Sequence, residues 1–400
     1  MTEELKLRAR SMGFLVGARL VINTAHRFVY PFLPVIARGL GISLNQAGTM
    51  VSVRWAASLA TPAVVHVVDR GRRPRRLIAV GLAMFITGAV VTVTTNVYIG
   101  ALVGFALMGL AKSAYDISAQ AYVSDRVPYA RRSRYLGILE LTWAGAFLIG
   151  APAAGWLIDR GGWELPYWVV AGLLTAALLV LPLFLDADVE HVARPSPALA
   201  LDTSASALLV VMGLFTGGAE LVFVVMGAWL EDSFGLSLLA LGGVALVLGI
   251  AELAGEGTVV AFTDRIGKRR SVAIGMVIAA VAFALMAPAE ERMGLGVALL
   301  AVALAGFEFT IVSSYPLASE VRPRARVKYL SLTVVAMGVG RAIGAFVGPR
   351  LFGIGGLPAP VLVAALANVV GLIVLLAFVR ERGVRPDDPV FDATGHLMAE

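Results

Sequence analysis

The sequence predicts an all-α membrane protein in which twelve transmembrane helices form two pseudo-symmetric six-helix bundles. Apolar residues make up 58% of the 400 residues and charged residues only 15%, against roughly 45–50% and 25% in an ordinary soluble domain. The apolar residues fall in runs of about 20, the length at which a helix crosses about 30 Å of hydrocarbon. A charged pattern that begins at Asp69 returns at Asp264, 195 positions later. Such a long repeat indicates two related halves, because solenoid units are far shorter.

Twelve apolar stretches define the expected spans. Arg19, His26 and Arg27 interrupt the first stretch, which is too long for a cleaved signal peptide and is expected to remain as a helix. The spans are expected near residues 12–37, 43–68, 77–96, 98–123, 133–158, 166–185, 204–230, 236–261, 272–288, 294–316, 329–352 and 359–379.

The two halves set the expected domain boundaries. Residues 1–185 form the N-terminal bundle and residues 204–380 form the C-terminal bundle. The linker between them, 186–203, is polar and contains prolines, which is typical of a tether. The tail, 381–400, carries mixed charge. Linker and tail are both expected in the cytoplasm.

The distribution of basic residues predicts the orientation in the membrane. Most of the 33 Lys and Arg residues fall in loops on the same side as the N-terminus. By the positive-inside rule, both termini are expected in the cytoplasm of a multi-pass protein of the cell (inner) membrane. The net charge of +6 is divided among short membrane loops, whereas a nucleic-acid partner would need a contiguous basic face. No nucleic-acid partner is therefore expected.

Two charged motifs recur in both halves in the same order. An Asp-Arg pair ends one apolar stretch of each half, and a single acid ends another stretch on the same side of the membrane. The residues are Asp69, Arg70, Asp125, Asp264, Arg265 and Glu320. Ion pairs and helix-end charge interactions among them are expected to latch the cytoplasmic side shut. The alternative is that these charges only anchor the topology.

The placement of these motifs resembles that of the major facilitator superfamily over essentially the full chain. The family carries Gly-x-x-x-Asp-Arg-x-Gly-Arg-Arg between its second and third spans and an echo of it between the eighth and ninth. The second copy here fits the Asp-Arg-x-Gly-Lys-Arg core. The first copy shifts its glycine to Gly71, and Val65 and Val260 replace the leading glycines. The resemblance implies a secondary transporter that works by alternating access.

The fifth span contains a run of small residues with a proline: Gly145, Gly150, Pro152 and Gly155. It resembles the exporter-associated motif of the family, although Ala151 interrupts the Gly-Pro step. Small residues allow close helix packing, and a proline bends a span. The eleventh span has a similar pattern, so the alternative is generic packing and the motif favours export only modestly.

Charged side chains inside spans carry the most chemical information, because each costs at least about 2.5–3.5 kcal/mol at the centre of a membrane helix. In the family the first, fourth, seventh and tenth spans line the central cavity, and the polar residues here concentrate on those four. The substrate-binding candidates on the first and fourth spans are Arg19, Asn23, His26, Arg27, Tyr30, Lys112, Asp116 and Gln120. Arg27 offers a planar fork for a carboxylate, either of a substrate or of the opposing half, such as Glu220. Lys112 and Asp116 are alternatively a pair that only satisfies itself.

Two acids stand alone in cavity spans, Glu220 in the seventh and Glu308 in the tenth. Neither has a basic neighbour one turn away on its own helix, so both are expected to couple transport to protons. The alternative is an acid hydrogen-bonded for structure. Other buried charges are expected to pair for structure, with Arg341 and Glu252 as plausible partners; the set is Arg54, Glu140, Glu252 and Arg341.

Several functional classes lack their sequence signatures. No phosphate-binding loop, clustered metal ligands or nucleophile–base arrangement is evident, so no cofactor, metal or enzyme activity is expected. We expect a monomeric, proton-coupled exporter whose partners are the bilayer, protons and small organic molecules. The alternatives are an importer of an anionic metabolite, suggested by Arg19, Arg27 and Lys112, and a membrane sensor that has lost transport.

Overall fold

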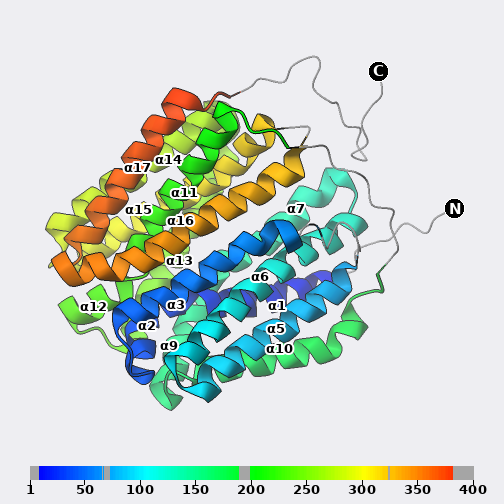
Figure 1. Cartoon of the computed structure of the whole chain (residues 1–400), viewed down its shortest axis with the longest axis horizontal. Helices are drawn as coiled ribbons and strands as arrows, with labels where there is room; N and C mark the ends of the chain where they lie inside the picture. Colours follow the sequence, from blue (N-terminus) through cyan, green and yellow to red (C-terminus); the bar gives the residue numbers. More distant parts are fainter. Residues whose placement is uncertain (1–8, 65, 67–72, 189–198, 323–324, 382–400) are drawn as a thin grey trace.

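The computed structural model describes residues 9–64, 66, 73–188, 199–322 and 325–381. This part of the chain is almost entirely helical and contains no strand. Its helices lie side by side along a common direction in two groups (Figure 1). The first group is α1 (Ala9–Arg27), α2 (Val29–Gly39), α3 (Leu44–Ala56), η1 (Ala57–Ala60), α5 (Pro74–Thr95), α6 (Tyr98–Arg126), α7 (Tyr129–Glu140), α8 (Thr142–Gly145), η2 (Ala146–Gly150), α9 (Ala151–Gly161) and α10 (Leu165–Phe184). The second group is α11 (Thr203–Phe223), α12 (Met226–Phe234), α13 (Leu238–Ile266), α14 (Lys268–Met286), η3 (Ala287–Ala289), α15 (Met293–Val321), α16 (Arg326–Gly355) and α17 (Pro358–Phe378).

The described helices confirm the all-helical membrane fold. Ten of them are long and apolar enough to cross a membrane, or eleven if the bent pair α1 and α2 forms one span. The second expected span, 43–68, is not one regular helix, because α3 ends at Ala56 and the 3₁₀ turn η1 follows. Pro62 has no N–H to donate four residues back, which favours a tightened turn before it. The count of twelve spans stays a prediction.

Prolines also shape the first and fifth spans. The axes of α1 and α2 differ by 58°, because Pro31 cannot hydrogen-bond the carbonyl of Arg27 at the end of α1. In the fifth span the π-helical turn η2 directly precedes α9, whose second residue is Pro152. Such a turn relieves the clash between a proline ring and the preceding carbonyl. Both breaks lie at mid-depth, where the charged residues gather.

The end of the molecule at which α10 ends and α11 begins is called here the linker end. Asp188 accepts hydrogen bonds from the backbone N–H groups of Arg75 (2.8 Å) and Arg76 (3.3 Å) at the start of α5. Glu381 accepts one from the N–H of Lys268 (3.1 Å) at the start of α14. Acids at these positions accept hydrogen bonds from the free N–H groups of the helix start and interact favourably with the positive end of the helix dipole. The two halves therefore repeat a capping contact as well as a sequence motif.

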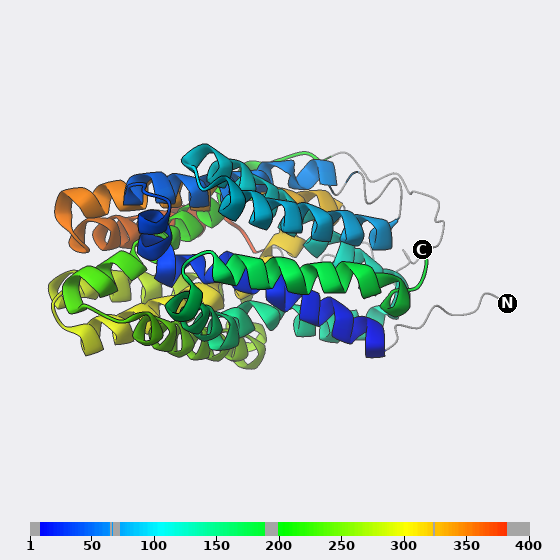
Figure 2. The ribbon, with the colours of Figure 1, turned by 90° about the horizontal axis from the view of Figure 1, so that it is seen from below.

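The first and last described helices also meet the linker end. Ser11 of α1 donates to the carbonyl of Phe184 in α10 at 2.6 Å, and α1 lies alongside α10 (Figure 2). The N–H of Arg380, just beyond α17, donates to Ser204 Oγ at 3.1 Å. Both ends of the described chain thus lie on one side of the molecule.

Contacts between the two groups of helices gather toward the opposite end, called here the far end. Arg38 and Glu231 form an ion pair of 2.7 Å there, and nearer mid-depth Ser52 donates to the carbonyl of Ala342 at 2.7 Å. At Gly155 of α9 a Cβ atom would lie 2.8 Å from the carbonyl oxygen of Leu238 in α13. The glycine thus allows two backbones from opposite halves to approach closely.

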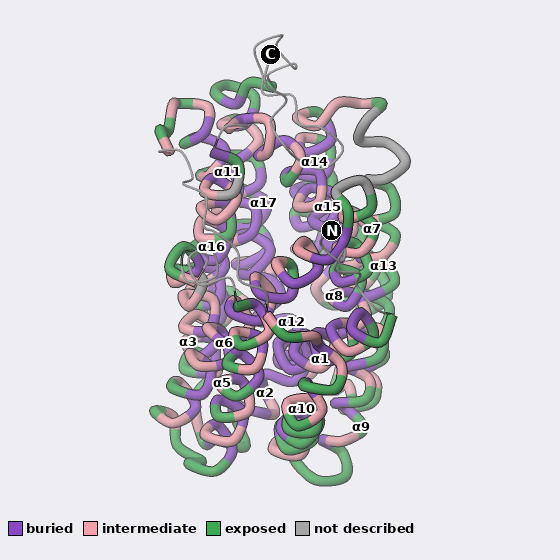
Figure 3. Tube along the Cα trace, turned by 90° about the vertical axis from the view of Figure 1, so that its right-hand side faces the viewer, coloured by how far each residue is buried: buried purple, intermediate pink, exposed green. Residues whose placement is uncertain are grey.

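Burial separates the inner from the outer faces of the helices. Buried residues line the faces that neighbouring helices share, and exposed residues follow the outer surface (Figure 3). Large apolar side chains are among the most exposed, including Ile99 (72%), Leu179 (75%) and Ile354 (86%). An apolar outer surface is what a bilayer requires.

Candidate functional site

The first charged cluster, at mid-depth in the first half, joins α1, α6 and α7. Arg19 Nε lies 2.9 Å from Asp116 Oδ1, and Arg19 Nη2 lies 3.0 Å from Glu140 Oε1. Lys112 Nζ lies 2.7 Å from Asp116 Oδ2 and 2.7 Å from Asn23 Oδ1. The ion pair considered as the alternative for Lys112 and Asp116 is therefore present, and substrate binding by these residues stays a prediction. Two cations face two acids, so this cluster is internally balanced. Glu140 pairs with Arg19, but it is exposed and not buried as expected.

Two more residues predicted for substrate binding lie beside that cluster. The side-chain amide of Asn23 also donates to Thr142 Oγ1 at 2.9 Å, which ties α1 to α8. Gln120, one turn beyond Asp116 on α6, is exposed. Gly145 and Gly150 of the fifth span face Leu20 and Thr24 of α1, so the small residues of the exporter-like motif also serve packing within the first half.

The second cluster crosses from one half to the other. Arg27, at the end of α1, donates from both Nη atoms to the two carboxylate oxygens of Glu252 in α13. Arg27 also donates to the carbonyl of Trp143 at 3.1 Å and lies 3.6 Å from the centre of the Phe147 ring. Both members of the pair are buried, with exposures of 2% for Arg27 and 0% for Glu252. Arg27 thus binds a carboxylate of the opposing half, which is one of the two kinds of partner expected for it.

The partners expected for these groups need correction. The sequence suggested Glu220 as an acid for Arg27 and paired Glu252 with Arg341, whereas Arg27 binds Glu252 and Arg341 binds Glu220. Residues of α11 and α16 approach closely through Gly217 and Gly340, and this approach brings Glu220 and Arg341 together. The assignment of spans from the sequence does not show that α11 and α16 are neighbours.

Glu308 of α15 lies beside Glu252. Glu308 packs against α13 one turn from Glu252, because a Cβ atom at Gly255 would lie 3.1 Å from the Cβ atom of Glu308. Glu252, Glu256 and Arg27 are all within electrostatic range of Glu308. Glu308 is 3% exposed, and within the described part of the chain its Oε1 atom has no hydrogen-bond partner. A buried carboxyl therefore adjoins the ion pair that links the halves, and adjacent carboxyls can share a proton.

Glu220 is fully partnered by comparison. Its Oε1 accepts from the Tyr30 hydroxyl at 2.7 Å and from the Trp55 indole N–H at 2.9 Å, and its Oε2 lies 3.1 Å from Arg341 Nη1. Tyr30 and Trp55 belong to the first half, so neutral donors of one half hold an acid of the other. This network explains why a carboxylate can remain buried there.

The five substrate-binding candidates of the first span contact different parts of the structure. Arg19 and Asn23 face the first cluster, Arg27 and Tyr30 face acids of the second half, and His26 packs beside Trp55 and Phe85, with ring centroids at 6.3 and 5.9 Å. The first four residues lie at successive heights along the unbroken α1 and so meet different neighbours, whereas Tyr30 lies beyond the break, where a continuous helical pitch no longer relates it to them. All five side chains still lie inside the protein.

Arg54 departs from its predicted role as one member of a buried pair. It is 2% exposed, and no acid pairs with it in the described residues. Its guanidinium carbon lies 5.6 Å from the ring centroids of Tyr30 and Phe105 and 5.9 Å from that of Trp55. The expectation of a structural ion pair at Arg54 is therefore wrong for the described part of the chain.

The repeated motifs at the linker end are partly described. Asp69, Arg70 and the side chain of Asp264 lie outside the described part of the structure. Glu320 forms an ion pair with Lys268, whereas Arg265 is exposed. Asp125 lies in the last turn of α6. The predicted partnership between the motif and an acid ending another span is thus found for Glu320, with the motif lysine as the cation; a latching role stays a prediction.

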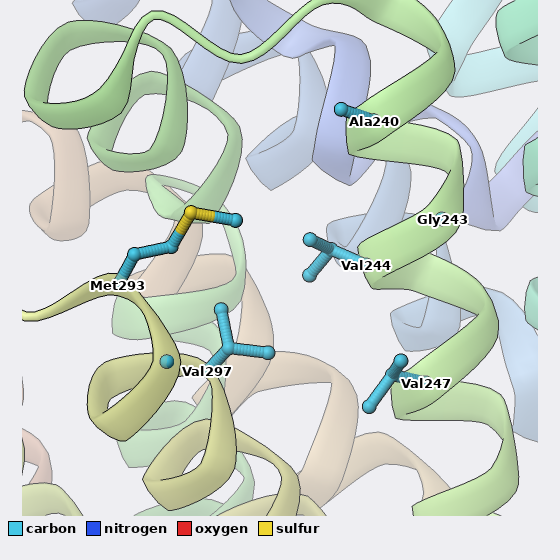
Figure 4. Close-up of a pocket in the computed structure, with 7 residues that line it drawn as sticks. Ala240, Gly243, Val244, Val247, Met293 and Val297 are labelled. Atoms are coloured by element: carbon cyan, nitrogen blue, oxygen red, sulfur yellow. The ribbon is translucent and has the colours of Figure 1, made fainter.

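A separate pocket of about 360 Å³ lies between the first turns of α13 and α15 (Figure 4). It is lined by apolar side chains and glycines: Ala240, Gly243, Val244, Val247, Met293, Gly294 and Val297. None of the predicted site residues lines it. The chemistry therefore concentrates on the charged clusters at mid-depth.

Comparison with known proteins now identifies the family. The sequence profile of the Major Facilitator Superfamily matches residues 15–211 and again residues 208–398. The chain belongs to this superfamily. It is therefore a multi-pass membrane protein of a transporter family, and the resemblance inferred from the motifs is confirmed.

Relatives match over most of their length at low identity. An uncharacterized MFS-type transporter of Bacillus subtilis, YwfA, is 26% identical over 88% of this chain and 86% of its own. The multi-drug resistance efflux pump PmrA of Streptococcus pneumoniae is 23% identical over 85% of this chain and 87% of its own. A bacterial homologue of the human lysosomal transporter Spinster, crystallised in an inward-facing and occupied conformation, superposes with a TM-score of 0.69 at 14% identity, covering 92% of this chain and 95% of that one. This last likeness concerns the fold alone.

Proposed function

We propose that the protein is a secondary transporter of the inner membrane, with both termini in the cytoplasm, that exports small organic molecules in exchange for protons. Residues 1–185 and 204–380 act as two bodies joined by the linker 186–203. Export is supported by the relatives with drug-efflux names and by the glycine-proline run of the fifth span, which packs against α13 of the other half.

The observation that carries the proposal is the buried pair of Arg27 and Glu252 across the two halves. Alternating access moves the halves relative to each other, so this pair has to separate during the cycle. Separation leaves two desolvated charges and is strongly unfavourable while both groups are ionised. A proton on the carboxyl removes one of these charges. Proton binding can therefore unlock the halves.

Glu308 supplies the second carboxyl of this switch. It adjoins Glu252, so a proton can pass between the two acids over a short distance. When the proton leaves, Arg27 and Glu252 attract each other again and the halves close at mid-depth. Glu220, which already receives three donors, is the weaker of the two predicted proton carriers.

The importer alternative loses the residues that suggested it. Arg19, Arg27 and Lys112 each bind an acid, so these cations are compensated without an anionic substrate. Transport against the substrate gradient would also distinguish the exporter from a sensor, which binds its ligand without proton-dependent flux.

The test is proton-driven dye transport in proteoliposomes with an acidic lumen, using ethidium, rhodamine 6G and Hoechst 33342 as probes. Wild type is expected to concentrate at least one dye in the lumen. Glu308→Gln is expected to reduce accumulation to the level seen without a gradient while leaving dye binding intact, because the amide cannot release a proton.

Glu291→Gln, which neutralises an exposed acid at the far end, serves as the matched control and is expected to transport normally. Uphill transport by the Glu308 variant would refute the assignment, and absence of transport of all three dyes by wild type would refute multidrug export.

A further inference from the structure

Arg54 of α3 has an unusual position among the buried charges. Within the described part of the chain, its Nε and Nη2 atoms are buried without a hydrogen-bond partner. The residue is 2% exposed, so bulk water does not solvate its guanidinium. Three aromatic rings surround the group at 5.6–5.9 Å, near the outer limit at which cation–π attraction is significant.

The other four cations at mid-depth are already compensated. Arg19 and Lys112 share Asp116 and Glu140, Arg27 holds Glu252, and Arg341 holds Glu220; these contacts are the ion pairs described above. Glu308 forms no ion pair among the described residues, and the cations within its electrostatic range are Arg27 and Arg341, not Arg54. The first half therefore carries one positive charge that no described residue balances.

The surroundings of Arg54 contain further unpartnered polar atoms. Tyr167 of α10 is fully buried and lies within electrostatic range of Arg54, and its hydroxyl has no hydrogen-bond partner in the described residues. His26 is 3% exposed and lies in the field of Arg54 and Lys112, and its Nδ1 atom is likewise unpartnered there. A tyrosine hydroxyl can donate a hydrogen bond, as can Nδ1 in the tautomer that carries its proton.

We propose that Arg54 forms a binding site for a small monovalent anion, either a halide ion or the carboxylate of a transported molecule, inside the first half. The fork of Nε–H and Nη2–H donors matches a carboxylate and also converges on a single spherical ion. The Tyr167 hydroxyl and His26 Nδ1, both without a partner among the described residues, are the further donors that the chain offers to the anion. The anion cancels the charge that the surrounding acids leave uncompensated.

This site is independent of the export proposal, because it rests on the surroundings of Arg54 and not on the direction or coupling of transport. It lies next to Trp55 and Tyr30, whose donors hold Glu220. An anion bound at Arg54 therefore lies next to the residues through which the first half contacts Glu220.

The test measures thermal midpoints of the purified full-length protein in detergent at constant ionic strength. Chloride and bromide form one titration series, acetate and propionate form a second, and the sodium salt of the bulky sulfonate MES replaces them as reference. The wild-type midpoint is expected to rise saturably in at least one series. Saturation by halides identifies a resident ion, and saturation by carboxylates alone identifies a group of the transported molecule.

Arg54→Met keeps the length of the side chain and removes its charge. The variant is expected to show no response to either series, to be no less stable than wild type in the MES salt, and to be less stable at saturating anion. A reversal of the stability order of the variant and wild type between the two salts distinguishes anion binding from simple packing. An equal loss of stability in every salt would show that the aromatic rings alone hold the arginine and would overturn the proposal, as would a wild type that responds to neither series.

Tyr167→Phe provides a second route if the arginine variant does not accumulate. Loss of one donor to the anion is expected to raise the apparent dissociation constant by about tenfold, the effect of a hydrogen bond to a charged group. Tyr115→Phe is the matched control, because its equally buried hydroxyl donates to the carbonyl of Leu15 at 2.9 Å. An unchanged dissociation constant in the Tyr167 variant, or an equal change in both variants, would contradict the site.

Discussion

The two halves share a helical scaffold and differ in the sign of their buried charge. At mid-depth the first half carries four cations and two acids: Arg19, Arg27, Arg54, Lys112, Asp116 and Glu140. The second half carries one cation and three buried acids: Arg341, Glu220, Glu252 and Glu308. The position 195 residues after Lys112 is Phe307, the neighbour of Glu308. Nearly the same place in the repeat thus holds a cation in one half and an acid in the other.

The difference shows which parts of a repeat can diverge. The caps of α5 and α14 by Asp188 and Glu381 are repeated, since every helix start needs acceptors for its free N–H groups. Buried charge has no such requirement and is constrained only by its partners. Opposite charge makes the halves attract each other at mid-depth, and in the proposed mechanism a proton on Glu252 weakens this attraction.

The largest effect is expected from breaking the charged link between the halves. Arg27→Ala leaves Glu252 buried and without its cation, and removal of one member of such a pair is expected to lower the free energy of unfolding by about 3–5 kcal/mol. Denaturant unfolding of the purified protein measures this loss. The double variant Arg27→Met, Glu252→Met removes both charges and is expected to recover most of the stability while remaining inactive in proton-driven transport. A double variant as unstable as the single one would mean that Arg27 stabilises the fold through Trp143 and Phe147 instead.

A smaller effect is expected from comparing two acids of the second half. Glu220→Gln removes the partner of Arg341 and is expected to cost about 2–3 kcal/mol. Glu308→Gln breaks no ion pair among the described residues, so its expected cost is only about 1 kcal/mol. Both changes replace a carboxylate by an amide of the same shape, so each controls for the other in thermal unfolding. Equal destabilisation by the two would show that Glu308 has a cationic partner and would remove the contrast on which the proton assignment rests.

The sequence predicted the helical membrane fold, the repeat and the family because these depend on local features. Runs of apolar residues and the spacing of Asp69 and Asp264 are visible without knowledge of packing. The pairing of Lys112 with Asp116 was considered as an alternative for the same reason, since residues four apart share a helix face.

The remaining pairs depend on which helices are neighbours. Arg27 reaches Glu252 because α1 breaks after it and α13 passes beside the break, and neither fact follows from hydropathy. Glu220 meets Arg341 because glycines let α11 and α16 approach. The missing partner of Arg54 is equally hidden, because a sequence shows that a charge is buried but not what surrounds it.

The smallest expected effect concerns the neutral donors that the first half provides to Glu220. The Trp55 indole N–H lies 2.9 Å from Glu220 Oε1 and 3.0 Å from the Tyr30 oxygen, so one donor is shared between two acceptors. Trp55→Phe removes this donor and keeps an aromatic ring beneath Arg341, which lies 4.5 Å from the Trp55 ring centroid. Because Tyr30 and Arg341 still hold the carboxylate, the expected loss is about 1 kcal/mol, the net value of one hydrogen bond. Thermal unfolding of Trp55→Phe beside Tyr30→Phe measures the two donors separately. If ion pairs and not neutral hydrogen bonds hold the halves together, Trp55→Phe and Tyr30→Phe both lose little stability and keep proton-driven transport. A loss from either one as large as that from Arg27→Ala would instead place the main link between the halves at Glu220.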